Sequence, residues 1–355
     1  MKAKKLLALL LAVVMVLSLM ACGTKKKEED PNATRTFTDS TGREVEVPVQ
    51  IDKVALSGPM AQIVLFALCP DKLVGVSNAW SKEAQEYLDE KYFNMPQIGQ
   101  LYGGQGELNL ETLLQSGAQV VIDVGEPKGS IKEDMDSLQQ QTGIPFLHIT
   151  ADTESYPAAY RMLGDLLNMK DEAQTLAAYC EKIYDRTVSI AGSVEKANVL
   201  YVTGDAGQNV IASGSYHAEI LDLLTNNLAV VDDPSSKGTG NEVSMEQILT
   251  WDPDVVIFAP ESIYDTVADD AAWQSVTAIK NGAYYEVPFG PYNWMGFPPS
   301  VQRYLGMMWL SKALYPDATV QYDLFDDVHE YYELFYHCDL TRAQYDALVA
   351  NSLGK

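Results

Sequence analysis

The chain has little positive charge. It carries 25 Lys and Arg against 49 Asp and Glu, for a formal net charge of −24. Proteins that bind nucleic acid need clustered Lys and Arg to neutralise phosphates. The composition therefore argues against a nucleic-acid partner, and we expect the acidity to serve solubility.

Cysteine and histidine are also scarce, with four of each. No CxxC spacing occurs, and at most one internal disulfide could form if Cys22 is modified, so buried small side chains are the simplest interpretation of Cys69, Cys180 and Cys338. A zinc or manganese binder needs three or more His or carboxylate ligands that converge. We expect no such set and predict no metal site, because the histidines are dispersed: His148, His217, His329 and His337.

The sequence lacks the local signatures of common enzymes. It contains no GxSxG elbow, no HExxH pair and no phosphate-binding loop. We therefore expect a protein that is not an enzyme and has no covalent cofactor. A cell-surface hydrolase with dispersed carboxylates is kept as the alternative from another functional class.

The longest apolar run stands at the N-terminus. Lys2, Lys4 and Lys5 precede the apolar residues 6–20, which form a stretch too short to span a bilayer comfortably. Residues 1–21 are interpreted as a secretion signal. Residues 19–22 read Leu-Met-Ala-Cys, which resembles a bacterial lipobox, so Cys22 is the predicted lipidation site. An uncleaved anchor helix is the alternative, and either would hold the protein at the extracytoplasmic face of the cell membrane.

The remaining chain predicts an α/β fold with two lobes. Residues 22–35 are charged and polar and are expected to form a flexible tether. Short β-branched runs then alternate with helical periodicity in 36–155 and again in 193–355. Residues 156–192 lack a strand pattern and predict two helices, the second long enough to link one lobe to the other. We expect three-layer lobes with a ligand cleft between them.

One short passage occurs twice, 135 positions apart. Residues 108–123 read LNLETLLQSGAQVVID and residues 243–258 read VSMEQILTWDPDVVIF, with five of sixteen positions identical. Each copy predicts a short helix followed by a buried strand. Asn109 and Ser244 are good N-caps, and Glu111 and Glu246 stand in the first turn, where a carboxylate stabilises the helix dipole. Stabilisation of the helix N-terminus is enough to explain either Glu by itself. It explains less well why both copies carry a Glu at the same position.

Four segments together resemble the substrate-binding lipoproteins of ABC importers, specifically the helix-linked type that handles ferric siderophores, haem and cobalamin. These are FTDSTGREVEVP near the N-terminus, the paired NLETLL and SMEQIL, the strand DPDVVIF, and PPSVQRYLGMMWLSKALYPD. The resemblance covers nearly everything after Thr36. It implies a monomer that captures an iron chelate and delivers it to an ABC permease dimer with ATPase subunits. It also implies that Glu111 and Glu246 dock into arginine pockets of the permease.

Ligand contacts are expected in loops at the carboxyl ends of strands, where open α/β sheets generally bind. The most informative loop is VPFGPYNWMGFPPSVQR, whose aromatic residues stand among Gly and Pro. Pro298 and Pro299 are expected to start a helix with Arg303 in its first turns, where an anion, from the ligand or from a local Asp or Glu, would be favourable. The predicted ligand residues are Met60, Asn78, Trp80, Tyr102, Tyr216, His217, Tyr292, Trp294 and Arg303.

The identity of the ligand stays open at this point. Because helix N-termini and Arg303 could hold an oxyanion, a molybdate- or tungstate-binding protein of the same architecture is the alternative to the iron-complex binder. A planar or conjugated chelate would gain more from the aromatic loop.

Overall fold

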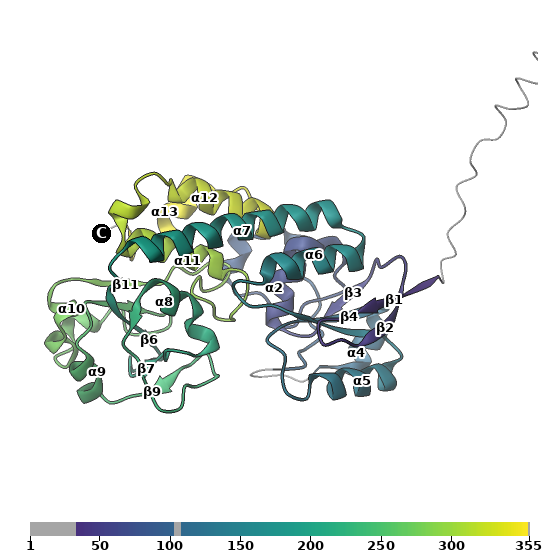
Figure 1. Ribbon diagram of the computed structural model, residues 1–355, viewed down its shortest axis with the longest axis horizontal. Coiled ribbons are helices and arrows are strands. Elements are labelled where there is room, and N and C mark those ends of the chain that lie inside the picture. The colour runs from purple at the N-terminus through teal and green to yellow at the C-terminus, as the bar shows by residue number, and fades with distance from the viewer. Residues whose placement is uncertain (1–32, 103–107, 354–355) are drawn as a thin grey trace, which may run out of the picture.

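A computed structural model describes residues 33–102 and 108–353, so the predicted signal peptide, Cys22 and all but the end of the tether lie outside the described residues. The chain forms two α/β lobes that one long helix bridges (Figure 1). This confirms the predicted fold class. Within the described ranges, no helix combines the length and apolarity needed to cross a membrane.

The first half of the chain contains a hairpin, a small parallel sheet and the helices around it. In chain order the elements are β1 (Thr34–Thr38), β2 (Glu44–Pro48), β3 (Val54–Leu56), α2 (Pro59–Leu68), 3-10 turns at Pro70–Lys72 and Glu83–Glu86, α3 (Glu90–Phe93), α4 (Leu110–Ser116), β4 (Val120–Gly125), α5 (Ile131–Thr142), β5 (Phe146–Thr150), α6 (Tyr156–Leu167) and α7 (Lys170–Ser193). Strands β3, β4 and β5 pair in parallel in that order.

The second half repeats the α/β alternation and ends in helices. Its elements are β6 (Asn198–Thr203), β7 (Asn209–Val210), a 3-10 turn at Tyr216–Ala218, α8 (Glu219–Leu224), β8 (Asn226–Asn227), β9 (Asn241–Glu242), α9 (Met245–Trp251), β10 (Val255–Phe258), 3-10 turns at Val267–Asp269 and Trp273–Ser275, α10 (Thr277–Lys280), β11 (Tyr284–Glu286), α11 (Arg303–Leu314), a 3-10 turn at Pro316–Thr319, α12 (Leu324–Tyr331), a π-helix at Tyr332–Tyr336 and α13 (Arg342–Leu348). The sheet order is β11-β10-β6-β7-β9, with β8 also paired to β6.

The two copies of the repeated passage adopt the same local structure. Strands β4 and β10 each pair in parallel with the first strand of their own sheet, β3 and β6. Helices α4 and α9 end in left-handed residues, Gly117 at φ 69° and Asp252 at φ 41°. Asn109 and Ser244 accept the predicted capping hydrogen bonds from the backbone N–H groups of Thr112 and Gln247. The repeat therefore encodes one helix–turn–strand unit in each lobe.

One strand expected from the sequence does not form. Residues 72–77, KLVGVS, make only isolated bridges, from Leu73 to Val54 and from Val76 to Gln97. The segment changes partner midway, since Val74 donates to the carbonyl of Val54 while Val76 donates to that of Pro96. A β-branched run without a continuous neighbour cannot build a ladder.

Helix α7 is embedded in the main core. Its buried apolar residues recur at helical spacing along one face, and they include Ala173, Leu176, Ala177, Cys180, Ile183 and Ile190. The same core includes buried residues of α2, α6, α8, α11 and α12, so it extends from one lobe to the other. The outer faces of the two sheets have separate clusters, around Val121 and around Val256. The linking helix is thus held along its length by packing.

Candidate functional site

The candidate site is built from loops of both halves, and its centre is a buried cation. Arg303 begins α11 and has no exposed surface. Its Nη1 lies 2.6 Å from Glu219 Oε2 and 3.2 Å from Thr153 Oγ1, and its Nη2 donates to the carbonyl of Tyr216. Burial of a charge is tolerable when it is paired and hydrogen-bonded in this way.

Thr153 links this ion pair to the first half of the chain. Thr153 follows β5 in the first lobe, and both its backbone N–H and its hydroxyl donate to the Glu219 carboxylate at the start of α8. The guanidinium also lies 4.7 Å from the ring centre of Tyr216. Arg303 therefore has an acidic partner from the protein itself, one of the two possibilities left open by the sequence. Its Nε has no hydrogen-bond partner among the described residues.

The start of α11 differs from the expectation. The helix begins at Arg303 itself, whereas Pro298 and Pro299 belong to the irregular loop before it. Consecutive prolines cannot donate backbone hydrogen bonds, and a proline disfavours the α conformation in the residue before it. The delayed start places the guanidinium close to Gly296, where an added Cβ would lie 2.7 Å from Arg303 Nε.

His217 and Phe297 lie beside the ion pair. A Cβ added at Gly238 would lie 2.1 Å from the ring of Phe297 and 3.1 Å from that of His217, so both rings approach this backbone closely. Burial, then the charge of Arg303, lowers the pKa of His217 to about 4, and Lys128 of the first lobe adds a smaller effect. Phe297 is 48% exposed. Gly238, His217 and Phe297 all belong to the second lobe, so its loops converge beside the ion pair.

A second group of predicted residues meets around Tyr292. The Tyr292 hydroxyl accepts a 3.0 Å hydrogen bond from Gln62, and its ring centre lies 5.7 Å from that of Trp80. Gln62 is buried and its carbonyl oxygen accepts from the backbone and side chain of Ser77. Burial raises the pKa of the Tyr292 hydroxyl well above its usual range. Gln62 therefore positions Tyr292, a role with no signal in the sequence.

The remaining predicted residues are more dispersed. The Met60 carbonyl accepts from Ser300 at 3.1 Å, and its methyl group packs on Gly125 at the end of β4. Asn78 donates to Gln100 at 2.9 Å, and the Tyr102 hydroxyl donates to Asp134 of α5 at 2.6 Å.

Trp294 lies in the core. Its side chain has no exposed surface, and it belongs to the same cluster as α7 and α11. Trp80 is 6% exposed and donates its indole N–H to the carbonyl of Tyr92. Of the loop aromatics, Phe297 is the most exposed, although it was not among the predicted ligand residues.

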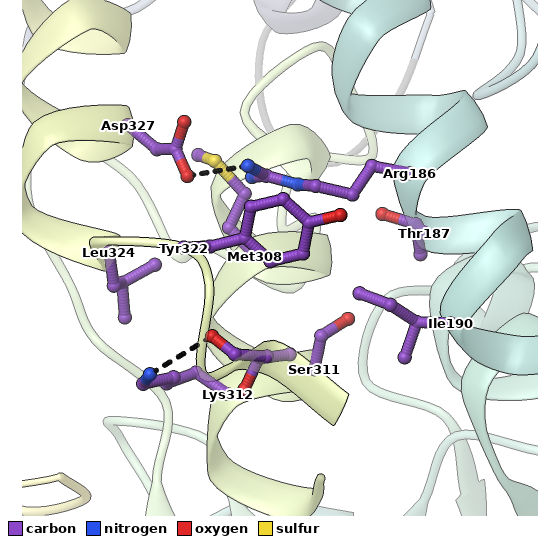
Figure 2. A pocket seen from close by; sticks show the side chains of 10 residues that line it. Arg186, Thr187, Ile190, Met308, Ser311, Lys312, Tyr322, Leu324 and Asp327 are labelled. Carbon is purple, nitrogen blue, oxygen red and sulfur yellow. Dashed lines mark hydrogen bonds and ion pairs between the residues drawn. The ribbon is translucent and has the colours of Figure 1, made fainter. Parts of the chain in front are cut away.

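A small cavity elsewhere in the molecule is a poor candidate for the ligand site. Its volume is about 20 Å³, which is room for roughly one water molecule. Figure 2 shows it between α7 and the segment around α11 and α12, where Arg186 pairs with Asp327 at 2.7 Å. Its lining residues come from α7, α11, α12 and the segment between the last two, and none of the predicted ligand residues is among them.

The comparisons with known proteins identify the family. The sequence matches the family described as "Periplasmic binding protein" over residues 54–290. The chain belongs to this family. The family and the helix-linked fold expected from the sequence are thereby confirmed, and the protein is a substrate-binding component of an ABC transporter. Binding proteins of ABC importers are non-enzymatic transport components that work with permease and ATPase partners. Family members act on the extracytoplasmic side.

Similar proteins of the family bind different substrates. The molybdate-binding protein MolA of Haemophilus influenzae is 23% identical over 90% of this chain and 95% of its own. An ABC transporter solute binding protein from Sulfurospirillum deleyianum is 27% identical, covers 88% of this chain and 98% of its own, and superposes with a TM-score of 0.80. The catecholate-siderophore binding protein VctP from Vibrio cholerae shares the fold at 17% identity, with a TM-score of 0.56 over 78% of this chain and 99% of its own.

Proposed function

We propose that this binding protein captures an iron complex, a siderophore-type chelate or haem, or the cobalt complex cobalamin, between its two lobes. The observation that carries the proposal is the partly exposed ring of Phe297 lying against Gly238, next to His217 and the Arg303–Tyr216 pair. An exposed aromatic ring suits a conjugated ligand. Tyr216, His217, Tyr292 and Arg303, with Met60, Asn78, Trp80, Tyr102 and Trp294 around them, form the proposed binding region.

Protein purified from its natural host gives the most direct test. Elemental analysis should find iron, or cobalt if the ligand is cobalamin, at close to one atom per chain. The absorbance spectrum should show a visible band, because ferric chelates, haem and corrinoids are coloured. Titration of ligand-free protein with a ferric catecholate, haemin, cobalamin and molybdate then compares affinities. Colourless protein that binds molybdate alone would overturn the iron-complex proposal.

Molybdate is the second candidate. The relative MolA is a molybdate-binding protein, and the unpaired Nε of Arg303 offers a buried donor. The existing Glu219 partner weighs against it, because an oxyanion would have to displace or share that carboxylate.

We further propose that the repeated helix–turn–strand units dock onto the permease. Glu111 and Glu246 are exposed in the first turns of α4 and α9. Leu114 and Leu249, three residues later and therefore on the same helix face, are 51% and 39% exposed. Helix capping accounts for a Glu at these positions, but it does not account for an exposed Leu beside each one. A carboxylate with an adjacent apolar side chain, presented once per lobe, suits a two-part permease.

The remaining features complete the proposal. Lobes of residues 36–155 and 193–355, joined by 156–192, hold the ligand at their seam. After removal of the signal peptide of residues 1–21, a lipid on Cys22 keeps the monomer at the extracytoplasmic membrane face through a tether of residues 22–35. Labelling with a radioactive or clickable palmitate, lost in Cys22→Ser, tests the anchor.

A further inference from the structure

Three potential metal ligands meet on the helical tail, away from the proposed ligand site. His329 lies in α12, Glu333 in the π-helix that continues it, and Asp339 in the segment that follows. One ligand atom from each lies within 4.8 Å of the other two. We predicted no metal site from the sequence, in which the two carboxylates stand among many other acidic residues.

The local backbone brings the three side chains together. The π-helix ends at His337, whose φ of 54° is left-handed and turns the chain. The backbone N–H of Cys338 then donates to the carbonyl of Tyr332, and Leu340 is buried in the core. These contacts fold the segment back along α12, so that Asp339 returns to His329. π-Helical segments occur frequently at functional sites.

The orientation of the imidazole favours metal binding. His329 Nδ1 lies 2.9 Å from the carbonyl oxygen of Leu340, which can only accept, so Nδ1 carries the proton. In the neutral ring, Nε2 is then an unprotonated acceptor, and it faces carboxylate oxygens of Glu333 and Asp339 at 3.7 Å each. Metal-ligating histidines almost always donate their other N–H to a carbonyl, a carboxylate or water in this manner.

Three acceptors that face one another need a cation between them. In the described part of the chain, no hydrogen-bond donor reaches the Nε2 atom or either carboxylate. The nearest arginine along the chain, Arg342, is turned to the rings of Phe325 and Tyr345 and pairs with Asp346. Either a proton on Nε2 or a bound metal ion can relieve the repulsion.

We propose that His329, Glu333 and Asp339 bind one divalent transition-metal ion, of which Zn²⁺ is the natural probe. One imidazole nitrogen and two carboxylate oxygens are suitable ligands for Zn²⁺. Bonds of about 2.0–2.2 Å in tetrahedral geometry place ligand atoms roughly 3.4 Å apart, so the observed 3.7 Å separations need little adjustment. The ion would join α12 to the segment after the π-helix, with water in the open position.

This site is independent of the proposed ligand site and docking surface. In Figure 1, α12 and α13 lie on the opposite side of α7 from α4 and α9. The side chains of Glu333 and Asp339 are 57% and 92% exposed, so a solvated ion can reach them directly. The role assigned to the ion is to stabilise the reversal that holds the C-terminal tail on the lobes.

The experiment is a calorimetric titration of the untagged protein with Zn²⁺ at pH 7.5, after treatment with a chelator. We expect one site, which weakens by at least about tenfold in His329→Gln and in Asp339→Asn. Glu330→Gln is the matched control, because Glu330 is a neighbouring carboxylate on the same helix that pairs with Lys182 instead. Its Zn²⁺ affinity should equal that of the unmodified protein.

Thermal unfolding gives a second readout. Zn²⁺ should raise the melting temperature of the unmodified protein and of Glu330→Gln, and should leave that of Asp339→Asn unchanged. Because Asp339 is almost fully exposed, this variant tests the proposal even if His329→Gln folds poorly. The proposal is overturned if the unmodified protein binds no Zn²⁺ below millimolar concentration, or if the affinity of Asp339→Asn is unchanged.

Discussion

At the scale of single residues, the buried ion pair of Arg303 and Glu219 has the strongest consequence for stability. Replacement of Glu219 by Gln should lower the free energy of unfolding of the ligand-free protein by about 3–5 kcal/mol, because a buried guanidinium would lose its counter-charge. Denaturant unfolding measures the change. The double variant Glu219→Leu with Arg303→Met removes both charges and should recover much of the loss. Equal destabilisation in the single and double variants would contradict this account.

His217 predicts a pH dependence. Its folded-state pKa of about 4 lies below the value near 6.5 expected in the unfolded chain. The unfolded state therefore binds more protons between these values, so this contribution to stability is complete above pH 6.5 and is lost as the pH falls towards 4. The His217→Gln variant should lose less stability than the unmodified protein between pH 7 and 5 in thermal melts. Parallel curves would show that His217 does not titrate in this way.

Variants of Trp294 and Phe297 distinguish a role in core packing from a role in ligand contact. Trp294→Ala should cost about 3–5 kcal/mol of stability because the indole is fully buried. Phe297→Ala should leave stability nearly unchanged and weaken ligand binding by about 1–3 kcal/mol, since its ring is half exposed at the seam. Unfolding and binding titrations of both variants test the pair. If Phe297→Ala binds ligand with normal affinity, the Phe297 ring does not contact the ligand.

At the scale of elements, the repeated units were readable from the sequence because their signals are local. N-cap residues, a first-turn Glu and a β-branched strand act within a few residues of one another, and both copies fold as expected. The apolar face of α7 was equally readable, because its apolar residues recur at the spacing of a helix. Residues 72–77 show the limit, because a β-branched run becomes a strand only when a continuous partner lies beside it.

The exposed faces of α4 and α9 give the prediction at this scale. Charge reversal in Glu111→Lys with Glu246→Lys, or loss of the apolar contact in Leu114→Ser with Leu249→Ser, should abolish or strongly reduce uptake by cells. Ligand affinity of the purified protein should stay within about threefold, because these side chains are exposed and lie outside the proposed ligand site. Gln141→Lys on α5 is a control for added charge, because this exposed glutamine bonds to Ser137 and not to Glu111 or Glu246. If the paired variants lose ligand affinity, α4 and α9 contribute to ligand binding and the docking proposal is contradicted.

At the scale of the whole molecule, the packing of α7 limits how far the lobes can move. The helix is buried along one face in a core that includes residues of both lobes, so large rotation would have to break that core. We expect X-ray scattering to show only a small decrease in the radius of gyration when ligand binds. A large compaction would contradict the stiff-linker prediction.

The sequence by itself determined the family, the α/β alternation, the linking helix and the paired glutamates, because each depends on composition or on patterns within a short segment. Only the tertiary structure decided that Arg303 pairs with Glu219, that Gln62 positions Tyr292, that Trp294 is core, and that His329 meets two carboxylates. Those contacts join side chains that are brought together by packing and by backbone reversal. The spacing of residues along the chain does not predict such contacts.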